Sequence, residues 1–257
     1  MKTENTTRRV LMVSAQLGFV VLLIVGWGIY AGSSRKNAFS AGTPLGTWNE
    51  LVSWFASGSI WKDLWATLSA AAGGYLVAVL LGTIIGVLTG IIPWLHDVLA
   101  PFFAFWNGFP RLAFYPFFAI LFGYSLVSRM ALVSFVIIFL IIANTAAGVR
   151  EVDGLILDNM RMLGASRFEQ VVHVYLPAAA VWIMTSARIT VGLALQAAIV
   201  AEFIGASSGL GYLTTVGQSQ FDTNIVWAAI IVVMVLAVII DRGLYGLQRR
   251  LTRWMPA

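Results

Sequence analysis

The chain has no cysteine among its 257 residues and only two histidines, His96 and His173, which lie far apart in sequence. A disulfide framework and a thiolate metal site are therefore excluded, and a histidine-based metal cluster is not expected. Charged residues are scarce at 11%, whereas hydrophobic residues reach 60%, above the roughly 45–50% of soluble domains. This composition indicates a membrane protein. Its net charge of +5 is better explained by basic loops on one side of a membrane than by nucleic-acid binding.

Six apolar segments predict an all-α membrane protein with about six transmembrane helices. The segments are 10–30, 64–95, 98–123, 130–149, 177–201 and 225–240. The first is longer than the roughly 7–15-residue apolar core of a signal peptide, which favours a membrane anchor. The third contains Arg111 between Pro110 and Pro116, so we expect it to be kinked or broken beside a water-filled cavity.

Basic residues predict the orientation. With both termini inside, the inner segments hold Lys2, Arg8, Arg9, Arg150, Arg161, Arg167, Arg242, Arg249, Arg250 and Arg253. The outer segments hold Arg35, Lys36, Lys62 and Arg129. Cytoplasmic loops carry the excess of lysine and arginine, so this distribution favours an N-in, C-in topology and a cytoplasmic position for residues 150–175.

The chain is expected to divide near residue 60. Residues 1–60 would form an N-terminal cytoplasmic tail, the first transmembrane helix and an external loop, and residues 61–257 would form the core with the polar segment 150–176. Within the second apolar segment, Gly82, Gly86 and Gly90 recur every four residues. This small-xxx-small pattern predicts close approach of a neighbouring backbone.

The polar segment 150–176 is predicted to form a short amphipathic helix followed by a turn. Its apolar residues recur at steps of three or four, which predicts one apolar face; they are Val152, Leu155, Ile156, Met160 and Leu163. Gly164 stands where a glycine would end the helix, and Ser166 could cap a second one. From periodicity alone, the apolar face fits lipid and a protein partner equally well.

The run from Asp158 to Pro177 resembles the cytoplasmic signature of bacterial ABC importer permeases, in which Glu-Ala-Ala precedes a glycine and a Leu-Pro pair. Gly164, Val174, Leu176 and Pro177 fall in register, whereas Asp158-Asn159-Met160 replaces Glu-Ala-Ala. Further runs resemble the nitrate/sulfonate/taurine branch of that family: LGASR at 163–167, AEFIGA at 201–206 and SSGLGY at 207–212. The resemblance covers roughly residues 60–255.

The resemblance implies a type I ABC importer fold in the bacterial inner membrane, with a cytoplasmic coupling helix. It also implies the partners: two copies of an ABC ATP-binding subunit that carry ATP and Mg²⁺, a second permease copy as a homodimer, a periplasmic or lipid-anchored solute-binding protein, and membrane lipid. The chain itself is not expected to be an enzyme or to bind a cofactor. A P-loop needs glycine immediately before lysine, and Lys2, Lys36 and Lys62 follow other residues.

The resemblance also implies which residues contact the ATPase. This predicted coupling set is Asp153, Asp158, Asn159, Arg161, Met162, Leu163, Gly164, Ala165, Ser166 and Pro177.

Polar residues inside the spans form the predicted translocation pathway, because unpaired ions cost several kcal/mol at bilayer depth. They are Asn107, Arg111, Tyr115, Arg188, Gln196 and Glu202. Arg111 and Arg188 could each attract substrate or form a structural pair, and Glu202 could hold the loop after its span or contact substrate.

Two substrate classes remain open. Small organic or inorganic anions such as sulfonates, taurine or nitrate suit the branch and the two arginines. A flat aromatic solute such as a vitamin or its precursor would suit the aromatic run 102–109. A channel would not need a docking helix, and a membrane enzyme would need acidic residues or histidines that the spans lack apart from Glu202.

Overall fold

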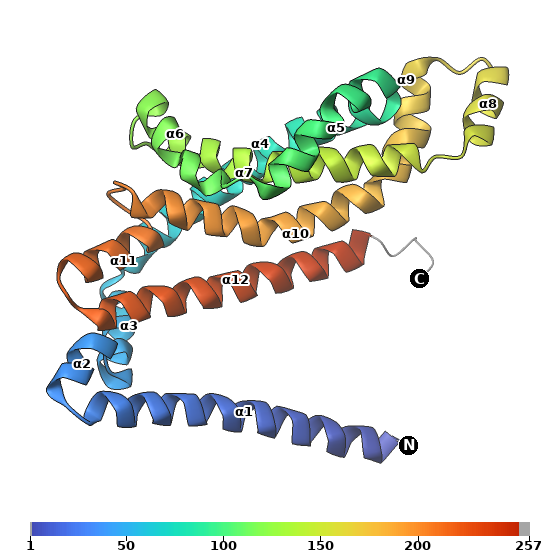
Figure 1. Cartoon of the computed structure of the whole chain (residues 1–257). Coiled ribbons are helices and arrows are strands. Elements are labelled where there is room, and N and C mark those ends of the chain that lie inside the picture. Colours follow the sequence, from blue (N-terminus) through green and yellow to red (C-terminus); the bar gives the residue numbers. More distant parts are fainter. Residues whose placement is uncertain (1, 252–257) are drawn as a thin grey trace. The chain divides into compact units, whose positions relative to one another are not determined.

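The computed structural model describes residues 2–251, and the side chains described are those of residues 11–246 except 13, 104 and 107. Every regular element in this part of the chain is helical (Figure 1). The elements are α1 (Lys2–Gly32), α2 (Arg35–Ala41), α3 (Pro44–Ser57), α4 (Ile60–Ile91), α5 (Pro93–Gly108), η1 (Arg111–Phe114), α6 (Tyr115–Phe122), α7 (Leu126–Arg150), α8 (Gly154–Met162), α9 (Arg167–Gln170), η2 (Val171–Tyr175), α10 (Leu176–Phe203), α11 (Leu210–Ser219) and α12 (Thr223–Leu251).

Five helical stretches in the described residues are long and apolar enough to cross a membrane. They are Ser14–Gly32, Ile60–Ile91, Leu126–Arg150, Arg167–Phe203 and Thr223–Gly246. The prediction of six is therefore not confirmed. The difference lies in segment 98–123, which the structure divides between α5, η1 and α6. Pro110 and Pro116 lack the N–H that a continuous helix would use, so none of the three pieces reaches spanning length.

The second predicted span also ends earlier than expected. We expected residues 64–95, but α4 runs over Ile60–Ile91 and Pro93 opens α5. Proline is well tolerated in the first turn of a helix and disrupts a helix interior. The boundary therefore falls just before it.

The chain forms two compact units, each described by itself. The first comprises the chain up to Trp61 together with Leu213–Val232, and the second comprises Lys62–Tyr212 and the chain from Val233 on. In the first unit, the segment between α2 and α3 is bonded to the beginning of α12: the Thr43 N–H donates to Asn224 Oδ1 at 2.8 Å.

The second unit is organised around α7. Its buried side chains, including Leu132, Ile137 and Ile141, pack against the small residues Ala194 and Ala198 of α10. Small side chains let the two helix backbones come close together, which is how helices without a hydrophobic driving force associate in lipid.

Three glycines of α4 lie against the second half of α7. A Cβ atom added at Gly86 would lie 2.6 Å from Thr145 Cβ, and one at Gly90 would lie 2.6 Å from Val149 Cβ. At Gly82 the nearest atom, Ile141 Cβ, would be at 3.0 Å. The predicted close approach at these three glycines is confirmed, and α7 is the neighbour.

Candidate coupling segment and polar sites in the spans

The coupling segment begins with a well-capped short helix. The side chain of Asp153 accepts a hydrogen bond from the Leu155 N–H at 2.9 Å, which satisfies one of the free donors at the start of α8. Asp153, placed in the coupling set, therefore serves as the N-cap of α8 in the structure.

Gly164 follows the end of α8 and allows the chain to turn there. This residue has φ +80°, a left-handed conformation that favours glycine. Its N–H bonds to the Arg161 carbonyl at 3.0 Å, and the Ala165 N–H bonds to the Met160 carbonyl at 3.0 Å. These two bonds form a Schellman motif. The helix end predicted at Gly164 is confirmed.

A second cap starts the return to the membrane. Ser166 and Glu169 form a capping box: the Glu169 N–H donates to Ser166 Oγ at 3.2 Å, and the Ser166 N–H donates to Glu169 Oε2 at 2.6 Å. The cap predicted at Ser166 is confirmed.

The chain then enters α10 through a widened turn. Residues Val171–Tyr175 are π-helical, and the Leu176 N–H bonds to the Val171 carbonyl five residues earlier. Pro177 follows directly, in the first turn of α10. Because its ring would crowd the carbonyl four residues before it in a regular α-helix, the wider π turn accommodates it. Leu-Pro at this point therefore shapes the junction between the coupling segment and α10.

The segment presents apolar side chains outside the helix pair formed by α7 and α10, and Figure 1 shows α8 standing away from that pair. Met162 is 82% exposed and Leu163 86%. Leu155 and Phe168 are exposed as well, whereas Val152 and Met160 are half-buried. The predicted stripe is therefore split, with its outer part available to a partner. The charged pair Arg161–Asp158, at 3.0 Å, lies on the solvent-exposed surface.

Arg111 binds the backbone of α7. Its Nη1 donates to the Val136 carbonyl at 3.0 Å, and the side chain is half-buried. Tyr115, which we placed in the pathway, is fully buried in the core around α7. Its hydroxyl has no hydrogen-bond partner among the described residues. The structure thus gives Arg111 a structural contact and places Tyr115 away from any open space. Asn107 lies in α5, with its side chain outside the described part.

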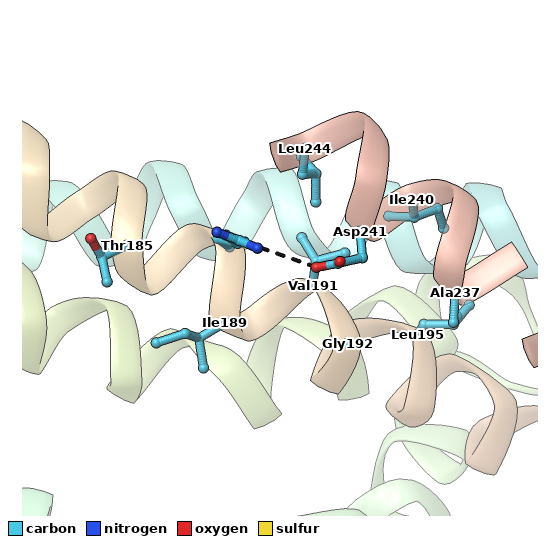
Figure 2. Close-up of a pocket in the computed structure, with 10 residues that line it drawn as sticks. Thr185, Ile189, Val191, Gly192, Leu195, Ala237, Ile240, Asp241 and Leu244 are labelled. Carbon is cyan, nitrogen blue, oxygen red and sulfur yellow. Dashed lines mark ion pairs between the residues drawn. The ribbon is translucent and has the colours of Figure 1, made fainter. Parts of the chain in front are cut away.

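Arg188 lines a pocket of about 500 Å³ between α10 and the second half of α12, and Figure 2 shows Ile189, Asp241 and Leu244 of its wall. The Arg188 Nε is 3.9 Å from Asp241 Oδ1, and its Cζ lies 4.9 Å from the centre of the Tyr245 ring. Apart from Arg188 and Asp241 the wall of the pocket is mostly apolar, and it includes Ile189, Leu195, Ile240 and Leu244. An arginine paired with an acid and an aromatic ring can remain charged in such surroundings. Gln196 is exposed on α10 and does not line this pocket.

Glu202 is the centre of a buried polar cluster. One carboxylate oxygen, Oε2, accepts from Thr67 Oγ1 and from the Gly211 N–H, both at 2.9 Å. The other oxygen, Oε1, lies 3.5 Å from Arg129 Nη1. Buried charges need such pairing and hydrogen bonding to be tolerated.

The same cluster holds the turn between α10 and α11. The Gly209 N–H donates to Asp63 Oδ1 at 2.8 Å, and the Leu210 N–H donates to Thr67 Oγ1 at 2.9 Å. Gly209 has φ +125°, and an added Cβ would overlap the Glu202 carboxylate. The motif at 207–212 is therefore a tightly packed turn whose backbone donors face acidic and hydroxyl side chains.

The predicted pathway residues do not converge on one site. Arg111 contacts α7, Arg188 contacts α12, and Glu202 contacts α4, α7 and α11. Sequence reasoning missed their partners, above all Asp241 and Arg129. Asp241 could have been found from the sequence, because it directly follows the apolar run 225–240 and could pair with the arginine inside the preceding span, Arg188.

A match to a known protein family identifies the class of this protein. Residues 78–253 match the family described as "binding-protein-dependent transport system inner membrane component". The chain belongs to this family. It is therefore a multi-pass permease of the bacterial inner membrane.

Relatives and solved structures agree with this membership. The permease is 32% identical to the taurine transport system permease of Escherichia coli over 78% of this chain and 73% of that protein. It is 31% identical to a putative aliphatic sulfonates transport permease of Bacillus subtilis, over 91% and 84%. A riboflavin transport permease of Chloroflexus aurantiacus is 29% identical, over 91% and 88%. The fold is similar to a chain of the MetNI methionine ABC transporter in an inward-facing conformation, with TM-score 0.63, 18% identity and coverage of 76% and 95%.

Proposed function

We propose that this permease forms the translocation pathway of an ATP-driven importer for a small sulfonate or related oxyanion that an external binding protein delivers. The family description supports dependence on a binding protein, and the taurine and sulfonate relatives support the substrate class. A separate ATP-binding subunit supplies the energy, because this chain has no P-loop lysine.

The observation that carries the proposal is the apolar surface of the coupling segment. Met162 and Leu163 are more than four-fifths exposed at the end of a short helix outside the spans. Exposed apolar residues of this kind mark an interaction site, and the ATP-binding subunit is the expected partner. Movement of that subunit would be transmitted through the capped turn at Gly164 and the π turn into α10.

Replacing Leu163 tests this proposal. A carboxylate in the contact should prevent docking, so Leu163→Asp should abolish ATPase stimulation by substrate-loaded binding protein in the reconstituted transporter. Leu163→Met is the matched control because it keeps an apolar side chain of similar volume. Gly164→Pro should also uncouple the transporter, since proline cannot adopt the φ of +80° found here. Normal stimulation in Leu163→Asp would contradict the proposal.

A flat aromatic solute is the second candidate, favoured by the riboflavin relative. The aromatic run of α5 gives it little support. The Trp106 ring stacks on Phe139 at 3.9 Å and meets Phe135 edge-on at 4.6 Å. These rings pack against α7, where they stabilise the bundle. We therefore place the sulfonate class first.

A further inference from the structure

Helix α3 carries an exposed apolar stripe that no other part of its unit covers. Leu45, Trp48, Val52 and Phe55 are spaced by three, four and three residues, so they share one face. All four are exposed, with Leu45 at 71% and Trp48 at 63%.

The other faces of α3 differ in character. Thr47 is buried on the far side of the helix, and a Cβ at Gly46 would meet the Asn224 side chain at 2.7 Å, so this side packs against the protein. Asn49 and Ser53 are exposed and lie at the edge of the apolar stripe. A packed face, an apolar sector and a polar shoulder are the layout of a helix lying at a membrane surface.

The beginning of α3 lies level with the end of a membrane span. Pro44 Cγ would lie 3.8 Å from a Cβ at Gly28, one turn before the end of α1. The indole N–H groups of Trp27 and Trp227 both donate to the Ala41 carbonyl, at 3.1 and 2.8 Å. The segment before α3 is thus bonded to the end of α1 and to the beginning of α12.

The end of α3 is also close to a span. Only Gly58 and Ser59 separate Ser57 from α4, which begins at Ile60, and two residues reach about 7 Å at most. Both ends of α3 are therefore tied to helices that are long and apolar enough to span a membrane.

Charge and neighbouring surface favour lipid as the occupant. Glu50 is the single charged residue of α3, and the exposed Arg35 and Lys36 of α2 can bind lipid phosphates. The spanning part of α1 is only 6% buried, so its lipid-facing surface leads directly to this region. Tryptophan at such a boundary is typical of the membrane interface.

We propose that α3 is an interfacial helix whose stripe of Leu45, Trp48, Val52 and Phe55 inserts among phospholipid headgroups and upper acyl chains. The inserted stripe sets the depth at which α1 ends and α12 begins. It holds the segment 39–43, which is bonded to both helices, at the membrane surface.

Spin labels can test this directly, because the chain has no cysteine and each label site is unique within it. Single cysteines would replace Leu45, Trp48, Val52 and Phe55, with Asn49 and Ser53 as matched controls on the polar shoulder. The full permease, with its co-purifying subunits made cysteine-free, would be reconstituted in phosphatidylethanolamine–phosphatidylglycerol bilayers. Collision with oxygen, which is enriched in lipid, would be compared with collision with a water-soluble nickel chelate.

We expect oxygen collisions to exceed nickel collisions at the four stripe positions and the order to reverse at residues 49 and 53. High collision rates with both reagents along the stripe would mean water exposure and overturn the proposal. Low rates with both would mean that a protein surface covers the stripe, which would also overturn it. Retained basal ATPase activity in each labelled variant shows that the helix is measured in folded transporter, and the result does not depend on which solute is carried.

Discussion

Among single residues, Glu202 shows how a membrane protein holds a buried charge, because its charged partner, Arg129, lies 73 residues earlier in the chain. Its carboxylate is buried, yet both oxygens have partners, from Thr67, Gly211 and Arg129. Removing one member of a buried ion pair leaves the other charged and unpaired, which costs more than the pair itself contributes. The cluster therefore stabilises the turn between α10 and α11 only while it is complete.

Substitution of Glu202 should consequently destabilise the protein. We expect Glu202→Ala to lower the free energy of unfolding by about 3–5 kcal/mol, the range for breaking a buried pair. Glu202→Gln should cost less, because an amide oxygen can still accept from the Gly211 N–H. Thermal unfolding of the detergent-solubilised protein measures both.

The control is Asp158→Asn, which removes an exposed ion pair with Arg161 and should change stability by less than about 1 kcal/mol. Equal losses for Glu202→Ala and Asp158→Asn would show that the cluster is not a stabilising one.

At the level of whole helices, the contact between α4 and α7 depends on glycine at a regular spacing. Side chains of α7 occupy the space that a Cβ would need at Gly82, Gly86 and Gly90. In lipid the attraction between helices comes from close packing, so a single methyl group in this contact matters.

Gly86→Ala should separate the two helices locally. Its Cβ would lie 2.6 Å from Thr145 Cβ and 2.9 Å from the Ile142 carbonyl oxygen, and overpacking of this kind costs about 1–3 kcal/mol. Gly18→Ala in α1 is the matched control, because a Cβ there meets nothing within 4 Å. Unfolding in a denaturing detergent should show a loss for Gly86→Ala and no loss for Gly18→Ala. Equal stability of the two variants would contradict close packing at α4.

At the level of the whole molecule, the described residues hold one candidate coupling segment, formed by α8 and α9. The two ATP-binding subunits of the proposed importer need one docking segment each. We therefore propose that the complex contains two permease chains.

We expect native mass spectrometry of the purified complex to give two copies of this chain and two ATP-binding subunits. Co-expression of differently tagged copies is the control, because a homodimer would retain both tags after sequential purification. One permease copy in each complex, or a different permease as the second subunit, would contradict the proposed homodimer.

Features that depend on a few neighbouring positions of the chain were predictable from the sequence. The capped turn at Gly164 and Ser166 and the close packing at Gly82, Gly86 and Gly90 were predicted from a few neighbouring positions. The count of six spans is not confirmed at segment 98–123, where the break predicted beside Pro110 and Pro116 divides the segment between α5, η1 and α6. Helices α2 and α3 were missed within an expected external loop, because their apolar residues do not reach spanning length.

The sequence by itself determined the membrane class and the family and predicted the coupling segment, because composition, periodicity and motif spacing are properties of the linear chain. Only the tertiary structure decided the partners of the intramembrane charges. Arg111 donates to the Val136 carbonyl, Arg188 meets Asp241, and Glu202 meets Arg129 and Thr67. These partners lie on other helices. A charge within the membrane needs a partner, but the sequence does not show which distant residue the fold brings next to it.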